Sequence, residues 1–402
     1  MAQTAHAKPG KPMIGTDGMS RRQFAAFSTF GAFSAFGLRP DGRAPEGGSG
    51  PKVSAGRWPG YERAIAIDCL ATPGPFNVNN MFAAPFTDAA ITNARASGMT
   101  AVNVTLNGNG NGPVAFLQSV QNIAFLEHEF EAHPDVLIKV KTVADIRRAK
   151  DTKTLGLIPG FQDATMLEDD PSRVGTFHRL GIRVIQLTYN RRNLLGDGCL
   201  EPANAGLSGF GRAAVAQMNS AGVLVDLSHC GRQTTLDGIT TSSKPVAVTH
   251  SGCAALSDSP RNKSDEQLKK LADKGGVVGI YLMPYLRAAG QPTADDVLDH
   301  IEHAVKVCGE DHVGIGSDQS ITPIDATPEY RKLHAETVRE RRRLGISAPG
   351  EREDVLVYTP DFNTPRRLDQ IADRMAARGH SATRIEKVIG GNWLRLFAEV
   401  WL

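Results

Sequence analysis

The run Val223-Leu224-Val225-Asp226-Leu227-Ser228-His229 is a short apolar stretch that ends in polar side chains. Pro245–His250 and Val313–Asp318 have the same form. Continuous apolar runs of this length are typical of strands buried on both faces of a parallel sheet. Because the carboxyl ends of parallel strands meet at one edge, the three runs predict a cluster that contains His229, His250 and Asp318.

Outward from this stretch, the chain contains eight such runs, and helix-compatible segments such as Gly209–Ala221 and Thr293–Cys308 lie between most of them. Eight units in one domain favour a closed (β/α)8 TIM barrel of the α/β class over an open doubly wound sheet. No Gly-x-Gly-x-x-Gly turn follows the first run, which disfavours a dinucleotide-binding domain. The predicted strands are Ala64–Leu70, Ala101–Asn107, Leu155–Gln162, Arg183–Asn190, Val223–His229, Pro245–Gly252, Gly275–Leu282 and His312–Asp318.

The overall composition is that of an ordinary globular protein. The 402 residues are 41% hydrophobic and 22% charged, and the net charge is +2. A chain of this size can form one large barrel domain, and its charge offers no basic surface for nucleic acid. The five cysteines are an odd number and include no Cys-x-x-Cys pair, so they do not predict a disulfide framework. Because the net charge is low, we expect a small substrate rather than a nucleic acid.

The N-terminal segment has the features of an export signal. Ser20-Arg21-Arg22-Gln23-Phe24 precedes an uncharged apolar run that ends at Leu38. A paired arginine before such a run predicts a twin-arginine signal over residues 1–38, and the run is too short to span a membrane. Residues 39–60, rich in Gly and Pro, are predicted as a flexible linker before a barrel domain at 61–402. The expected partner is the twin-arginine machinery, and the expected location is the periplasm or cell envelope.

The polar strand ends are also candidates for a metal site. Imidazole nitrogen and carboxylate oxygen are good zinc ligands, and His229, His250 and Asp318 would supply both. The alternative is that each of these residues is a hydrogen-bonded structural residue at a strand end. Their shared position on three strands favours a metal or catalytic role.

Five motifs carry a family resemblance. They are Asp226–His229, Thr249–Ser251, Ser259–Asn262, Asp311–Asp318 and Gly390–Arg395. In order and spacing they resemble the renal-type membrane dipeptidases, zinc-dependent hydrolases of dipeptides, from about Tyr61 to the C-terminus. The resemblance implies a barrel of the metallo-dependent hydrolase type, a dipeptide or another small carboxylated substrate, and a homodimer.

The resemblance also implies roles for individual residues. His229 and His250 resemble the two histidines that hold the second zinc ion. Arg261 resembles the arginine that binds the substrate's terminal carboxylate, and Asn262 beside it is predicted as a second substrate-binding residue. Asp318 resembles the acid–base residue that moves a proton from water to the leaving amine.

Four positions, on three strands, depart from the family pattern. Leu70 and Thr72 stand where the family has a His-x-Asp pair for the first zinc, and Gln162 stands where a glutamate bridges both ions. Tyr189 replaces a histidine that assists at the substrate carbonyl. Leucine cannot ligate a metal, and a neutral amide is a poor bridge between two cations. The first metal site is therefore predicted to be absent.

The sequence then leaves three interpretations of the site. In the first, one zinc ion on His229, His250 and a carboxylate from Asp318 or Asp163 activates a water that hydrolyses an amide-type bond. In the second, the site is metal-free, with histidine acid–base chemistry and Tyr189 as a proton donor. In the third, the protein binds a ligand without turnover. We take the first as the prediction.

A charged segment interrupts the barrel pattern after the eighth run. Residues 319–357 are predicted as an insertion that contains an Arg/Glu-rich helix at Tyr330–Leu344. A long insertion beside a barrel mouth tends to cover it. We therefore expect a lid or an oligomer contact.

Overall fold

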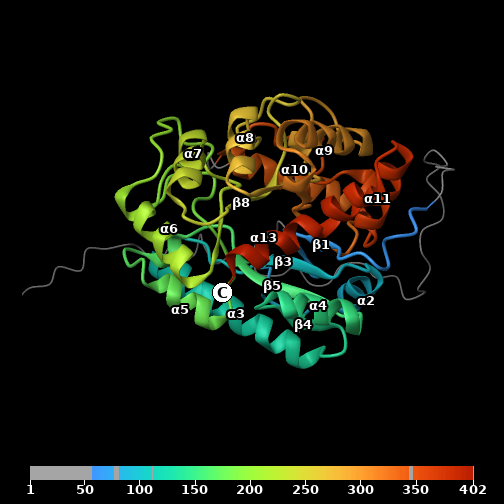
Figure 1. Ribbon diagram of the computed structural model, residues 1–402, viewed down its shortest axis with the longest axis horizontal. Helices are drawn as coiled ribbons and strands as arrows, with labels where there is room; N and C mark the ends of the chain where they lie inside the picture. The colour runs from blue at the N-terminus through green and yellow to red at the C-terminus, as the bar shows by residue number, and fades with distance from the viewer. Residues whose placement is uncertain (1–56, 77–80, 111, 344–346, 402) are drawn as a thin grey trace, which may run out of the picture. The chain divides into compact units, whose positions relative to one another are not determined.

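The eight predicted runs form a closed barrel of parallel strands. The computed structural model describes residues 57–402 except 77–80, 111, 344–346 and 402. Its strands follow the order β3-β1-β10-β9-β8-β7-β6-β5, and pairing of β3 with β5 closes the ring (Figure 1). The predicted (β/α)8 barrel is confirmed. Its strands are β1 (Ile67–Asp68), β3 (Ala101–Thr105), β5 (Leu155–Phe161), β6 (Val184–Gln186), β7 (Leu224–Asp226), β8 (Ala247–Ser251), β9 (Val277–Ile280) and β10 (Val313–Ile315).

Three further short strands lie beside the barrel. β4 (Leu137–Lys139) pairs with the first residues of β5. β2 (Ala71–Thr72) pairs in parallel with β11 (Gln319–Ser320), directly beyond β1 and β10. Segments of two or three residues are too short to show a periodic pattern, so the sequence did not predict them. The β2–β11 pair ties together the chain segments that leave β1 and β10.

The helices surround the barrel (Figure 1). The predicted helix Gly209–Ala221 is α6 with the same bounds, and α9 begins directly after the predicted Thr293. None of the helices in the described residues is long and apolar enough to cross a membrane. The others are α2 (Asp88–Ala96), α3 (Gly112–Ala132), α4 (Val143–Thr152), α5 (Arg173–Leu180), α7 (Arg232–Thr241), α8 (Asp265–Asp273), α10 (Pro328–Arg343), α11 (Arg367–Ala377), α12 (Ala382–Glu386) and α13 (Asn392–Val400), while α9 is Ala294–Cys308.

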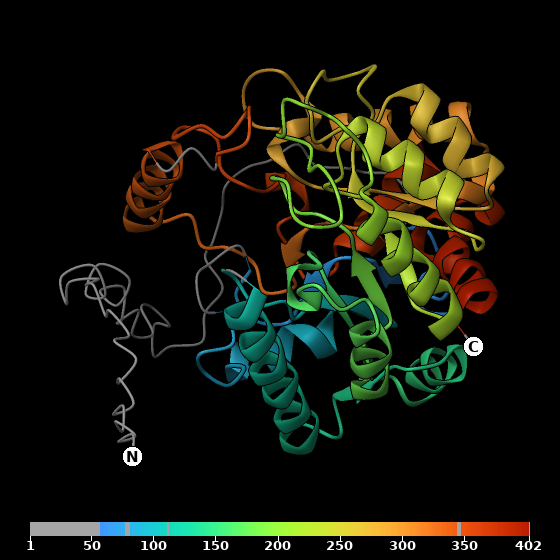
Figure 2. The ribbon, with the colours of Figure 1, turned by 90° about the vertical axis from the view of Figure 1, so that its left-hand side faces the viewer.

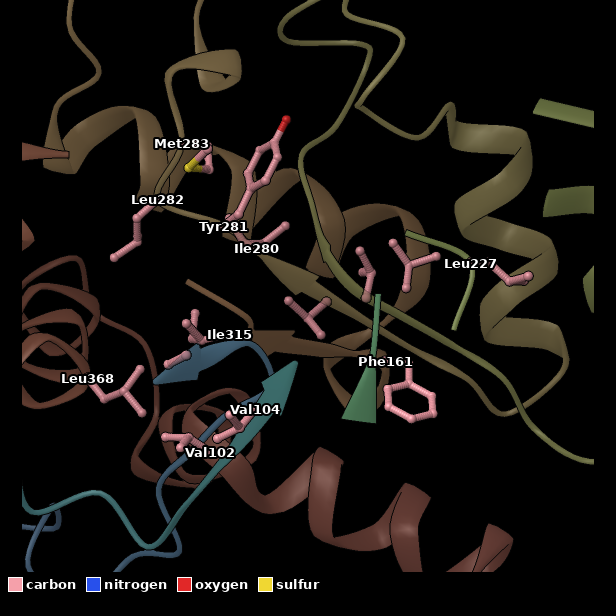
Figure 3. Close-up of a cluster of buried hydrophobic side chains, with 14 of the residues drawn as sticks. Val102, Val104, Phe161, Leu227, Ile280, Tyr281, Leu282, Met283, Ile315 and Leu368 are labelled. Atoms are coloured by element: carbon pink, nitrogen blue, oxygen red, sulfur yellow. The ribbon is translucent and has the colours of Figure 1, made fainter. Parts of the chain in front are cut away.

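Alternate strand residues pack on opposite sides of the barrel wall. One set packs against Trp393 and Phe397 of α13, which covers the amino ends of the strands: Ile67, Ala101, Val184, Leu224, Ala247 and Val277. Their neighbours Val102, Ile185, Val225, Val248 and Val278 belong to the larger apolar cluster, part of which Figure 3 shows. Apolar side chains fill the barrel at the amino ends of the strands, and the polar side chains gather at the carboxyl ends.

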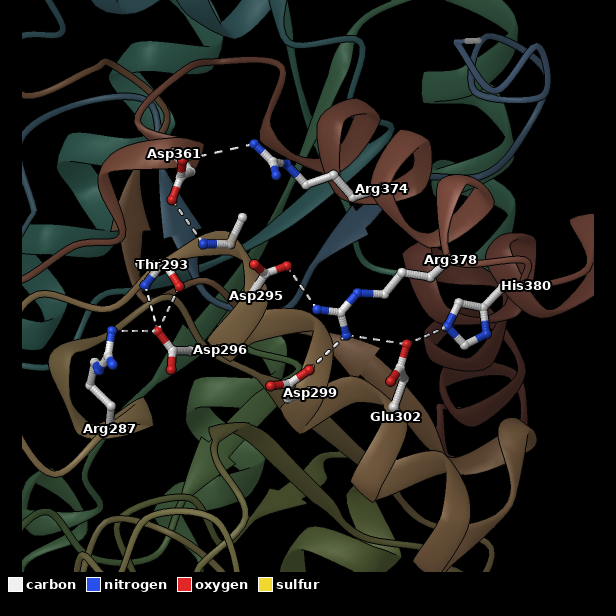
Figure 4. A network of polar contacts seen from close by, with 11 residues as sticks. Arg287, Thr293, Asp295, Asp296, Asp299, Glu302, Asp361, Arg374, Arg378 and His380 are labelled. Atoms are coloured by element: carbon white, nitrogen blue, oxygen red, sulfur yellow. Dashed lines mark hydrogen bonds and ion pairs between the residues drawn. The ribbon is translucent and has the colours of Figure 1, made fainter. Parts of the chain in front are cut away.

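Contacts near the start of the barrel domain and around α11 hold these segments in place. Trp58, in the predicted linker, is buried in the core, so packed structure begins before residue 61. The predicted signal at 1–38 and most of the linker lie outside the described residues. Arg378, just after α11, donates to Asp299 and Asp295 at 2.7 and 2.8 Å and thereby ties α11 to α9 (Figure 4). α11 also carries the buried Arg367, which donates to Ser317 Oγ at 3.0 Å beneath the barrel mouth.

Candidate active site

The carboxyl ends of β7, β8 and β10 come together at the barrel mouth. The rings of His229 and His250 lie 4.9 Å apart between centroids. The chain after β10 passes close to β8, because a Cβ on Gly316 would lie 1.8 Å from the carbonyl oxygen of Thr249 and 3.4 Å from Cβ of His250. A glycine at position 316 thus permits the approach. The segment that carries Asp318 therefore leaves the barrel beside the two histidines.

The ring of His229 is held in one tautomer by its two partners. Its Nδ1 lies 2.7 Å from Oδ1 of Asn190, and its Nε2 lies 2.9 Å from Nη2 of Arg261. An amide oxygen only accepts and a guanidinium only donates, so the proton is on Nδ1 and Nε2 accepts. Burial, followed by the Arg261 charge, lowers the pKa of His229 well below its ordinary value. His229 is therefore neutral.

His250 has the same tautomer for a similar reason. Thr249 Oγ1 donates to Asp226 Oδ2 at 2.7 Å and so accepts from Nδ1 of His250 at 2.9 Å. Nε2 of His250 faces the amide nitrogen of Gln162, a donor, at 3.4 Å. Burial and the charge of Arg261 lower the pKa of His250 well below its usual range. The Nε2 atoms of both histidines are thus acceptors that face donors.

Arg261 supplies a permanent positive charge to the mouth. Its side chain is buried, donates through Nη1 to the Ser228 carbonyl at 3.0 Å, and has its guanidinium carbon 6.0 Å from the ring centre of Tyr281. A guanidinium stays protonated throughout the physiological pH range. The mouth therefore carries a fixed cation beside a neutral imidazole.

Asp318 is buried, and its backbone has an unusual conformation. Its φ of 60° lies in the left-handed region, which is uncommon outside glycine. The conformation is stabilised by its own N–H, which donates to the Leu70 carbonyl at 2.9 Å, and by Ser317 N–H, which donates to Asp68 Oδ1 at 2.7 Å. Burial raises the pKa of Asp318 to about 7, although Arg261 opposes this rise. Its carboxyl therefore changes protonation near neutral pH.

Tyr189 lies over His229 at the open side of the mouth. The two rings are stacked, with centroids 4.1 Å apart and planes 20° apart. Although 39% of the residue is exposed, desolvation by its surroundings, followed by the nearby Asp318, raises the pKa of Tyr189 to about 12. The phenol is therefore neutral at physiological pH and can donate a hydrogen bond.

The insertion borders the same mouth. Arg341 of α10 makes a two-pronged ion pair with Glu351, at 2.8 and 2.9 Å. A Cβ on the neighbouring Gly350 would lie 3.2 Å from the ring of Tyr285, so this segment packs on a tyrosine that follows β9. In Figure 2, α10 lies on the side of the barrel away from the C-terminus. The helix predicted at Tyr330–Leu344 is confirmed by α10 up to Arg343, whereas Leu344 lies outside the described residues.

Two residues predicted for the site have their polar groups engaged elsewhere. Asn262 donates both amide hydrogens, to the carbonyls of Ser257 and Tyr285 at 2.7 and 2.9 Å, and accepts from Tyr281. These contacts fix the loop that carries Arg261, and the substrate contact of Asn262 stays a prediction. Asp163 accepts from Asn193, Thr165 and the Ala164 N–H, so it supports a turn.

Several functional neighbours were missed from the sequence. Asn190 orients His229 and could have been found, since it follows a predicted strand as the histidines do. Tyr281 and Tyr285 also follow a strand, β9. No local pattern points to Arg341 or Glu351, because their approach to the mouth depends on the path of the insertion.

An eight-stranded parallel barrel with histidines, an arginine and an aspartate at its carboxyl mouth defines an amidohydrolase-like hydrolase fold. A crystallised amidohydrolase from Pseudomonas aeruginosa has 33% identity and a TM-score of 0.71, and the match covers 85% of this chain and 98% of that one. Residues 77–342 match the membrane dipeptidases, Peptidase family M19, and the chain belongs to this family.

Curated relatives agree with this assignment. The dipeptidase tcpJ of Claviceps purpurea is 29% identical, over 70% of this chain and 59% of its own length. The dipeptidase verJ of Clonostachys rogersoniana is 32% identical, over 50% of this chain and 52% of its own length. The chain thus spans little more than half the length of these relatives. Family membership implies a hydrolase that depends on zinc.

The described residues do not fit a zinc ion at this mouth. Catalytic zinc sites use three protein ligands, and no three His, Cys, Asp or Glu side chains in the part of the chain that the structure describes are grouped to hold a metal. No such group among these described residues contains His229, His250 and Asp318. The physical reason is that Arg261 and the Gln162 amide occupy the Nε2 sides of the two histidines.

Proposed function

We propose that this protein hydrolyses an amide-type bond in a small carboxylated substrate such as a dipeptide. The observation that carries this proposal is one mouth that combines the buried Arg261 cation, the Asp318 carboxyl and the Tyr189 phenol. These groups can bind a carboxylate, move a proton and donate to an oxyanion. The dipeptidase names of the curated relatives support the same substrate class.

Substrate binding depends on Arg261. Two of its five N–H donors are used by Ser228 and His229, and the remaining donors can meet a carboxylate. His229 and His250 remain neutral at physiological pH because their pKa values lie well below the ordinary range. They therefore act as fixed acceptors that orient Arg261 and Gln162, and the predicted histidine acid–base chemistry is not part of the proposal.

The proton steps are assigned to Asp318. As the carboxylate, it takes a proton from water while the water oxygen attacks the substrate carbonyl carbon. The Tyr189 hydroxyl donates to the oxygen that becomes negative. When the C–N bond breaks, Asp318 returns the proton to the leaving amine, so one water yields one acid and one amine. No step is routed through a metal ion, because the residues present do not fit one.

A dipeptide panel tests this proposal. Purified protein is incubated with L-Xaa-L-Xaa and L-Xaa-D-Xaa dipeptides, and amine release is measured beside the Asp318→Asn variant. We expect turnover by the unchanged protein and loss of it in the variant. Binding by calorimetry without turnover of any dipeptide would instead identify a non-catalytic binding protein.

Export and self-association belong to the same proposal. The Arg21-Arg22 pair and the apolar run to Leu38 support export by the twin-arginine route to the periplasm or envelope. Replacing both arginines by lysine should retain a fused reporter in the cytoplasm. The homodimer that the family resemblance implies is tested by sedimentation of the purified protein.

A further inference from the structure

We propose that this family member carries out its function without the family's zinc ion, because hydrogen-bond donors of its own chain occupy both metal-facing imidazole nitrogens. The donors are the Arg261 guanidinium at His229 and the Gln162 amide at His250. This inference concerns the site of the hydrolase proposed above, but it is measured independently of turnover.

At His229 the obstacle is a charge. Because Nδ1 carries the proton that Asn190 accepts, only the Nε2 lone pair can bind a cation. That lone pair accepts from Nη2 of Arg261 at 2.9 Å. A divalent ion at this nitrogen would stand beside a permanent positive charge that is itself buried, and burial strengthens the repulsion.

At His250 the obstacle is a fixed neutral donor. The backbone N–H of Gln162 donates to Oδ1 of Asn107 at 2.9 Å, which fixes the start of this side chain. Its amide nitrogen faces Nε2 of His250 at 3.4 Å. An amide brings no negative charge to balance a cation, and the proton on Nδ1 directs the only lone pair of His250 toward this donor.

The carboxylates of Asp226 and Asp163 are engaged with other partners. Asp226 accepts from Ser228 Oγ at 2.6 Å and from Thr249 Oγ1 at 2.7 Å. Asp163 accepts a hydrogen bond from Asn193 within its turn, and the positive charge of Arg261 attracts the Asp318 carboxylate. Leu70, at the end of the first strand, is buried and has no ligand atom. A zinc ion would therefore find two neutral nitrogens and no carboxylate grouped with them.

The charge that a metal would supply is instead provided by the side chain of Arg261. A guanidinium attracts a substrate carboxylate or a developing oxyanion through fixed N–H donors and needs no deprotonated ligand set. Activity that depends on Arg261 rather than on zinc should survive a chelator.

Metal content of the full-length protein tests the inference. The protein is equilibrated with excess zinc and dialysed, and its metal is measured by mass spectrometry beside His229→Ala and His250→Ala. We expect far less than one zinc per chain in all three. About one zinc in the unchanged protein that both variants lose would overturn the inference, because catalytic sites hold their ion through such ligands. Zinc that both variants retain would lie elsewhere and leave the inference standing.

A variant designed to create a zinc site tests whether Gln162 and Arg261 are the residues that exclude the ion. The double variant Gln162→Glu with Arg261→Met adds a third ligand and removes the cation, so it should take up about one zinc. Circular dichroism confirms that it folds. A folded double variant that takes up no zinc would refute the role given to these two donors. Dipeptide turnover is read separately, so a zinc-free protein without turnover would contradict the proposed hydrolase while supporting the metal-free site.

Discussion

The barrel mouth has two halves that differ in chemistry. The half built on β7, β8 and β10 carries His229, His250 and Asp318, all buried, each with an altered pKa. The half built on the ends of β1 and β5 carries Leu70, Thr72 and Gln162, none of which is ionisable. We call the first the charged half, because it holds the Asp318 carboxyl and the adjoining Arg261 cation beside two neutral histidines, and the second the neutral half.

Leu70 and Thr72 of the neutral half contact the rest of the mouth through their backbone, whereas Gln162 faces His250 through its side-chain amide. The Leu70 carbonyl accepts from Asp318 N–H, and Thr72 pairs with Ser320 in the β2–β11 ladder. Both contacts use main-chain atoms, so they persist whatever side chains stand there. The side chains at positions 70 and 72 therefore do not determine these two contacts.

The largest effect is expected from removing the proton carrier of the charged half. Asp318→Asn keeps the size of the side chain and tolerates the left-handed backbone. It should lower kcat roughly 10²–10⁴-fold, the usual contribution of a positioned acid or base. Steady-state hydrolysis of a dipeptide found in the panel measures this.

The matched control is Asp163→Asn, a half-buried aspartate whose pKa is likewise raised by desolvation. Because Asp163 contacts its own turn, its variant should lose stability and keep most of its kcat. Equal loss of kcat in both variants would mean that Asp318 acts only as a structural residue.

A smaller loss is expected from Arg261→Lys. Lysine keeps the charge but lacks the planar fork that donates to Ser228 and His229 together. We expect kcat/KM to fall about 10²-fold, with KM for a substrate that has a free carboxylate affected most. A dipeptide amide, which lacks that carboxylate, is the control and should show little change in KM. An equal rise in KM for both substrates would argue against carboxylate binding by Arg261.

Because the pKa of Asp318 is raised, activity should rise and stability should fall as pH increases. kcat/KM should rise as pH increases through about 7, because the base form appears there. The folded state binds a proton that the unfolded state releases near pH 4, so this group's contribution to stability declines as pH rises toward 7. Relative to Asp318→Asn, the unchanged protein should lose roughly 2–3 kcal/mol of unfolding free energy between pH 5 and 8. Urea unfolding at the two pH values measures it, and parallel curves would contradict the raised pKa.

The sequence predicted the barrel well because its strands are buried on both faces and appear as continuous apolar runs. The strand-end rule also predicted that His229 and His250 lie together, and their ring centroids are 4.9 Å apart. The rule could not show which donors face each imidazole. That depends on the loop that carries Arg261, whose path Asn262 fixes through contacts with residues 257 and 285.

The approach of the insertion to the mouth had no local signal. Arg341 lies on a charged helix like many solvated ones, and only its pairing with Glu351 beside Tyr285 places it. The zinc set of His229, His250 and Asp318 stays a prediction, and no group of three ligands among the described residues supports it. Ligand residue types were present, but their hydrogen-bond partners are set by side chains distant in sequence.

Replacing Tyr189 should lower activity less than replacing Asp318 or Arg261 and more than replacing a residue of the neutral half. Tyr189→Phe keeps the ring stacked on His229 and removes the hydroxyl that donates to the oxyanion. We expect kcat to fall about tenfold with little change in KM, close to the loss of one neutral donor of about 1.4 kcal/mol. Steady-state kinetics with the same dipeptide measures it. An unchanged kcat would remove Tyr189 from the chemical step.

The smallest effect should come from the neutral half. Thr72 Oγ1 is buried and has no hydrogen-bond partner among the described residues, whereas its backbone belongs to β2. Thr72→Val keeps the shape and removes this hydroxyl, so it should leave kcat/KM unchanged and raise the unfolding free energy by about 1 kcal/mol or less. Thermal unfolding and dipeptide kinetics measure the two quantities. A loss of activity beyond a few-fold would show that the neutral half takes part in the chemistry through Thr72, and the contrast between the halves would then be wrong.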